Sequence, residues 1–69
     1  MEVFDVQSRI IKKIAFHPAN GQLWIQFRNG KERLYANVPR AAVDDLMAAV
    51  SPGQHYLDHI RNRFPRMAA

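Results

Sequence analysis

The sequence contains no cysteine among its 69 residues. It can therefore form neither a disulfide framework nor a cysteine-ligated zinc site, and this favours a reducing compartment. No apolar run approaches the roughly 18 residues that a membrane-spanning helix needs. The first residues, MEVFDVQSR, lack the apolar core of a secretory leader. From these absences we expect a cytoplasmic protein that does not enter a membrane.

Motifs of catalysis and metal binding are also missing. There is no cysteine nucleophile, no phosphate-binding glycine loop and no spaced set of serine, histidine and acid. His55 and His59 have the spacing of two ligands on one helix face, but no third ligand accompanies them in a known pattern. Ser8 and Ser51 are better explained as turn or cap residues. We therefore expect no enzymatic activity, no metal site and no cofactor.

Carboxylates are outnumbered in this chain. Ten lysines and arginines stand against six aspartates and glutamates, which gives a net charge of +4. A small basic protein can bind nucleic acid or an acidic protein surface, although an excess of this size also simply keeps a small domain in solution. Hydrophobic residues make up 48% of the chain, enough for a packed core. We expect one small domain over residues 1–69.

Alternation of apolar and polar side chains predicts three strands in the first half of the chain. They span residues 10–17, 22–28 and about 31–37. Turns separate them, at residues 18–21 and at Asn29-Gly30. Residues 1–9 have weak periodicity, and they either lie over a sheet edge or pair briefly as an extra strand.

The Asn29-Gly30 turn allows two registers between the second and third strands. A two-residue loop places Tyr35 opposite Trp24, on the face away from the core. A three-residue loop with Gly30 in the left-handed conformation places Tyr35 opposite Leu23, in the core. A slip of one residue moves every side chain of the third strand to the other face.

The second half of the chain predicts two helices. Pro39 begins the first, which continues to about Val50, and Ser51 is placed to cap the second, which Pro65 ends. The expected inward residues are Val43, Leu46, Met47 and Val50, then Tyr56, Leu57, Ile60 and Phe64. The fold class is thus α+β, a three-stranded antiparallel β-meander followed by two α-helices packed on one face, in the order β-β-β-α-α. Residues 66–69 form a short loose end.

The chain resembles the KTSC domain, found at the C-terminus of some lysyl-tRNA synthetases and as stand-alone bacterial or phage proteins. The resemblance covers about residues 8–64 and depends on short motifs in a fixed order. These are Ser8-Arg9-Ile10-Ile11, Leu23-x-Ile25-x-Phe27, Gly30, Tyr35, Val38-Pro39, Ser51, Gly53 and Ile60-Arg61. Where the family has the first tyrosine of a central pair, this chain has Arg33. The resemblance implies RNA binding, because of the synthetase connection.

The candidate binding residues are basic or aromatic, since bases stack on aromatic planes while lysine and arginine contact phosphate. They are Lys13, Trp24, Arg28, Lys31, Arg33, Tyr35, Arg61, Arg63 and Arg66. We expect a small non-enzymatic module that binds RNA or single-stranded nucleic acid. The alternative is a protein-interaction adaptor or inhibitor, phage- or mobile-element-borne, or a homodimer that uses the sheet face around Trp24. Each feature also has an ordinary explanation, in which Trp24 packs under the N-terminal segment and the charges are solvated.

Overall fold

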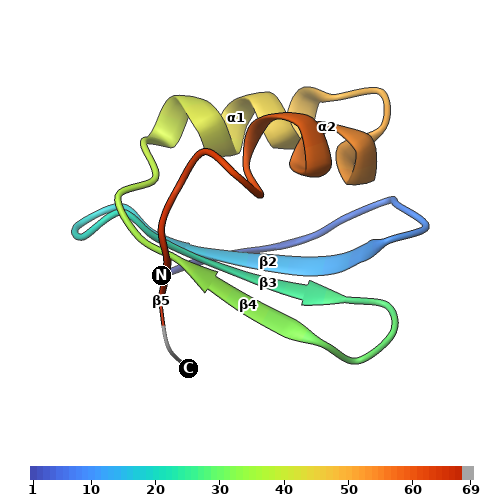
Figure 1. Ribbon diagram of the computed structural model, residues 1–69, viewed down its shortest axis with the longest axis horizontal. Helices are drawn as coiled ribbons and strands as arrows, with labels where there is room; N and C mark the ends of the chain where they lie inside the picture. Colours follow the sequence, from blue (N-terminus) through green and yellow to red (C-terminus); the bar gives the residue numbers. More distant parts are fainter. Residues whose placement is uncertain (68–69) are drawn as a thin grey trace.

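The computed structural model of the protein describes residues 1–67 and places two helices over one face of an antiparallel sheet (Figure 1). Within these residues the strands follow one another in sequence order: β1 (Glu2–Asp5), β2 (Ile11–His17), β3 (Gln22–Phe27), β4 (Glu32–Tyr35) and β5 (Arg66–Met67). The helices are α1 (Arg40–Ala48) and α2 (Pro52–His59). The predicted α+β class is therefore confirmed. The three-stranded meander is wrong, because β1 and β5 add a strand at either edge.

The two edge strands are defined by their pairing rather than by their own sequence patterns. β1 pairs with β2 in the antiparallel sense, as in one of the two alternatives for residues 1–9. β5 pairs through two residues only, opposite Leu34 and Tyr35 of β4. A two-residue strand has no alternation to detect, because periodicity needs at least four residues. The expected loose end is thus partly a strand, and Ala68 and Ala69 lie outside the described residues.

The turn between β3 and β4 has the three-residue form. The N–H of Gly30 donates to the carbonyl of Phe27 at 3.0 Å, and Gly30 has a φ of +88°, which glycine adopts without the steric cost of a side chain. Tyr35 consequently stands opposite Leu23 and is only 1% exposed. Of the two registers that the sequence allows, the structure has the one that separates Tyr35 from Trp24.

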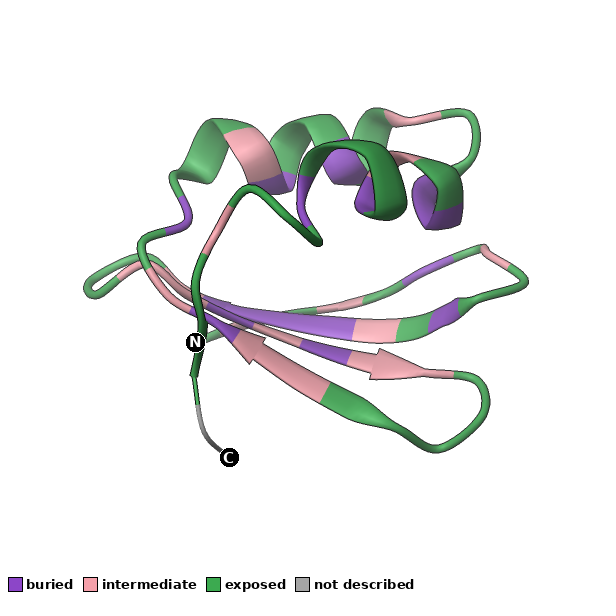
Figure 2. Ribbon diagram, in the orientation of Figure 1, coloured by how far each residue is buried: buried purple, intermediate pink, exposed green. Residues whose placement is uncertain are grey.

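The core lies between the helices and the sheet face beneath them (Figure 2). Its fully buried side chains are Tyr35, Phe16, Ile11, Ile14, Leu23, Ile25, Leu46, Ile60 and Val38. The inward positions predicted for Met47, Val50 and Leu57 are wrong, since all three are exposed. α1 ends at Ala48, so Val50 follows the helix and has left its apolar stripe.

Helix α2 begins as predicted and ends early. The Ser51 hydroxyl accepts a hydrogen bond from the N–H of Gln54 at 3.4 Å, and Pro52 occupies the first turn, so the cap is confirmed. The helix ends at His59, well before Pro65, and the chain then turns back to form β5. Neither helix of residues 1–67 has the length and apolar character needed to cross a membrane.

Candidate nucleic-acid interface

A cleft of about 470 Å³ runs between β4 and the end of α2. Arg33 and Tyr35 both face it, because alternate residues of a strand share one face of the sheet. Arg66 of β5 stands directly opposite Tyr35 and so joins the same face. Arg61 enters from the other wall, just beyond α2, where its N–H donates to the carbonyl of Tyr56 at 2.9 Å. Three separate segments thus bring these side chains together.

The cleft is lined by four cations: Lys31, Arg33, Arg61 and Arg66. We call these four residues, with Tyr35 and Tyr56 beneath them, the basic cleft. None of its lining residues is a carboxylate. Glu32 lies between two of the cations in sequence, but it accepts a hydrogen bond from Trp24 Nε1 at 2.9 Å, on the opposite face of the sheet. The four cations of the cleft carry a charge of +4. This equals the net charge of the whole chain, so the other charged residues balance one another.

Two tyrosine hydroxyls meet beneath the cations. The oxygens of Tyr35 and Tyr56 are 2.5 Å apart, and both side chains are buried. Burial raises the pKa of Tyr56, and the hydrogen bond with Tyr35 adds to the rise, while Arg33 and Arg61 act in the opposite direction. The phenol therefore remains neutral at physiological pH. Since one hydroxyl donates to the other, the acceptor keeps its own proton for a further partner.

Trp24 and Lys13 lie on the other side of the sheet from the basic cleft. Together with Met1, Val3 and Ala15 they line a shallow hollow of about 400 Å³. Trp24 is half-buried, and its Nε1 donates a hydrogen bond to the carboxylate of Glu32. The structure thus brings five of the nine predicted residues into one cleft and places these two on a separate surface.

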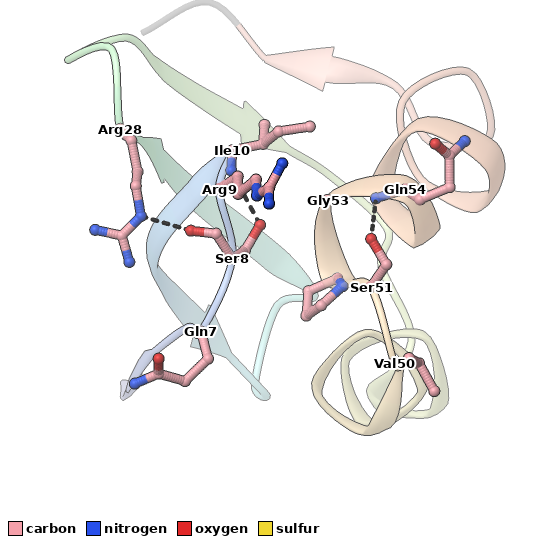
Figure 3. Close-up of a pocket in the computed structure, with 10 residues that line it drawn as sticks. Gln7, Ser8, Arg9, Ile10, Arg28, Val50, Ser51, Gly53 and Gln54 are labelled. Atoms are coloured by element: carbon pink, nitrogen blue, oxygen red, sulfur yellow. Dashed lines mark hydrogen bonds between the residues drawn. The ribbon is translucent and has the colours of Figure 1, made fainter.

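Arg28 is held by the backbone of the segment between β1 and β2. Its Nε donates to the carbonyl of Ser8 at 2.6 Å and its Nη2 to the carbonyl of Val6 at 3.3 Å, as Figure 3 shows for Ser8. The Ser8 hydroxyl in turn accepts from the N–H groups of Ile10 and Ile11. Arg28 therefore positions this segment, beside a hollow of about 560 Å³ that Arg9 also lines.

Arg63 lies in a third hollow, between the two helices. The same hollow is lined by Asp45 and by the two histidines of α2, whose ring centroids are 4.7 Å apart. Within residues 1–67, no group of three histidines, cysteines or carboxylates could hold a metal ion. Arg63 is thus separated from Arg61 by the direction of its side chain, although only one residue lies between them.

Tyr56 is the member of the cleft that sequence reasoning assigned only to the core. A buried tyrosine usually finds a partner for its hydroxyl, and this is the signal that could have linked it to Tyr35. The β5 pairing that delivers Arg66 has no comparable signal in the sequence, because it depends on where the chain returns after α2.

A family profile and a solved structure both identify one family. Residues 7–64 match the sequence profile of the KTSC domain. A protein from Tsukamurella paurometabola is 35% identical over 63 residues, which span 91% of this chain and 94% of that protein. The crystal structure of a KTSC domain protein from Yersinia pestis is similar with a TM-score of 0.90 and 32% sequence identity, over 99% of this chain and 96% of that chain. The chain therefore belongs to the KTSC domain family.

Proposed function

We propose that the protein is a non-enzymatic module that binds single-stranded nucleic acid, and RNA in particular, through the basic cleft. The observation that carries this proposal is the convergence of four cations, without a carboxylate, on one hollow. Cations gathered without intervening acids create the kind of focused positive field that attracts a polyanion. Affinity for nucleic acid depends largely on such phosphate contacts.

The details of the cleft support recognition of the phosphate backbone rather than of base identity. Three of the four cations are arginines, whose planar guanidinium forks match phosphate oxygens. Tyr35 is too deeply buried for its ring to stack on a base, so the tyrosines would contribute a hydroxyl hydrogen bond from beneath. We therefore expect binding with little sequence preference. The proposed contact excludes four of the expected residues, Lys13, Trp24, Arg28 and Arg63, which lie outside the cleft.

A titration of fluorescently labelled single-stranded RNA, followed by anisotropy at several salt concentrations, tests this function. Each phosphate contact on a single strand contributes about 0.7 to the slope of log K against log salt. We expect Arg61→Gln to weaken binding several-fold and to reduce the slope by about 0.7, because one contact is lost. Single-stranded DNA of the same sequence would show whether the ribose hydroxyls contribute.

The matched control is Arg63→Gln. Arg63 is an exposed arginine two positions after Arg61, and it lines the hollow between the helices rather than the basic cleft. This variant has the same charge change and should bind RNA like the unaltered protein. The proposal fails if the unaltered protein shows no salt-sensitive binding, or if the two glutamine variants lose affinity equally.

A further inference from the structure

The sheet face away from the helices carries an apolar row that crosses every strand. The residues that stand opposite one another, from β1 to β5, are Val3, Ala15, Trp24, Leu34 and Met67. We call this set the apolar row. The helices cover only the other face (Figure 1), and Val3 is 53% and Met67 36% exposed. Because the open face of an antiparallel sheet is normally polar, a continuous apolar row indicates an interaction surface.

A polar row lies beside the apolar row, on the side of the β3–β4 turn. From β1 to β4 it consists of Asp5, Lys13, Gln26 and Glu32. Lys13 on β2 and Glu32 on β4 are placed symmetrically about the central strand β3. Neither forms an ion pair within residues 1–67. The face therefore presents a cation and an anion at matching distances on either side of its middle strand.

In the apolar row, a small and a large side chain occupy equivalent positions on either side of β3. Ala15 on β2 is the smallest member, and the hollow of about 400 Å³ opens above it, between Val3 and Trp24. Leu34 on β4 holds the equivalent position on the other side of β3 and is a larger, half-buried side chain. A hollow and a larger side chain thus stand at equivalent positions.

We propose that this face binds a second copy of the chain. The two copies are related by a two-fold axis that is parallel to β3 and lies midway between the two stacked sheets. A half-turn about that axis places β2 of one copy over β4 of the other. Lys13 then faces Glu32 of the second copy, and this contact occurs twice, as in any isologous interface. Leu34 enters the hollow above Ala15, and Trp24 meets Trp24. Sheets stacked face to face keep their strands within about 30° of one another, and this axis permits that arrangement.

A second copy fits this face better than other occupants do. Nucleic acid is disfavoured, because the polar row holds two carboxylates and one lysine. Another copy supplies the complementary charge and the complementary size at the same time. The molecule measures 27 × 23 × 22 Å, so a face-to-face contact of two sheets would bury at most on the order of 600 Å² per copy, somewhat below a standard interface. The dimer should therefore be weak.

Sedimentation equilibrium from about 10 μM to about 1 mM, the range in which a weak dimer dissociates, tests this arrangement. We expect the unaltered protein to dimerise with increasing concentration. Lys13→Glu and Glu32→Lys should each weaken dimerisation at least about tenfold, because each sets like charges opposite one another twice. An equimolar mixture of the two variants should form heterodimers, since every acidic site then faces a lysine. Trp24, the single tryptophan, reports the same contact by its fluorescence.

Matched controls come from the helix layer. Arg63→Glu and Asp45→Lys make the same charge changes at exposed positions away from the sheet face, and each should dimerise like the unaltered protein. Far-ultraviolet circular dichroism checks that all variants are folded. A strictly monomeric protein at about 1 mM would overturn the proposal and leave a different polypeptide as the partner of this face. The proposal would also be overturned if Lys13→Glu and Glu32→Lys left the dissociation constant of the dimer unchanged, or if the two variants failed to associate when mixed.

Discussion

Tyr56 makes two contributions that depend on one hydroxyl group. Its oxygen satisfies the hydroxyl of Tyr35 inside the core, at 2.5 Å, and the pair forms the base of the basic cleft. A buried hydroxyl without a partner is costly, so the two tyrosines stabilise one another. Arg33 and Arg61 are close enough to act on the pKa of Tyr56, which links this core pair electrostatically to the cations above it.

We expect Tyr56→Phe to lower the free energy of unfolding by about 1–3 kcal/mol at neutral pH, because the Tyr35 hydroxyl loses its partner. The pKa of Tyr56 is raised above the ordinary 10.0 of a tyrosine, so the folded state keeps a proton that the unfolded state releases. The stabilisation that Tyr56 gives the folded state is fully present below about pH 10, and it is lost as the pH rises further. The difference between the two proteins should therefore narrow in alkaline solution.

Urea denaturation of both proteins at about pH 7 and about pH 11 measures this effect. Both proteins have the same lysines, so the effect of lysine titration on stability cancels when the two proteins are compared at each pH. A stability difference that is the same at the two pH values would contradict the assignment.

At the scale of elements, the segment between β1 and β2 is fixed against the start of α2. Arg28 holds this segment through two carbonyls. On its other side, a Cβ at Gly53 would lie 2.9 Å from Ile10 Cδ1 and 3.1 Å from Ser8 Oγ. A side chain at position 53 would therefore force Ile10 or Ser8 to shift, so glycine there serves close packing of the helix against the segment.

Gly53→Ala should accordingly destabilise the protein by about 1–3 kcal/mol through overpacking, although alanine is the better helix former. Adding Ile10→Val removes the Cδ1 atom that would clash, and it should restore part of the lost stability. Thermal unfolding of the single and double variants measures both effects. A neutral or stabilising Gly53→Ala substitution would show that the segment moves aside without cost.

At the scale of the whole molecule, the two proposed surfaces lie on opposite sides of the sheet. The basic cleft faces the helices, whereas the apolar row lies on the open face. They share no residue, although β4 and β5 contribute neighbouring residues to both, and Arg66 and Met67 are an example. A dimer formed through the open face would leave both basic clefts accessible.

We therefore expect affinity for a short single-stranded RNA to be independent of dimerisation. Lys13→Glu, which should be monomeric, and Arg63→Glu, which should be dimeric, have the same net charge, so their RNA dissociation constants should agree within about twofold. Anisotropy titrations at one salt concentration measure both constants. A large difference would mean that the two surfaces are coupled, or that Lys13 itself contacts the RNA.

Much of the fold could be predicted because it depends on local patterns. The alternation around Ile25 predicts β3, and Ser51 with Pro52 predicts the start of α2. The basic cleft was only partly predictable, since its residues come from β4, β5 and the end of α2. The sequence showed that these side chains are basic or aromatic, but not which of them meet. Arg61 and Arg63 illustrate the limit, because they look equivalent in sequence and line different hollows.

The sequence by itself determined where the three central strands and the two helices form, because side-chain alternation and helix capping act over a few neighbouring residues. Only the tertiary structure decided the face of Tyr35 and the partners of the edge strands. Both loop lengths at Asn29-Gly30 satisfy the turn locally. The three-residue form is the one that buries the Tyr35 ring beside Leu23 and brings its hydroxyl to Tyr56, contacts that form only when β4 and α2 pack together.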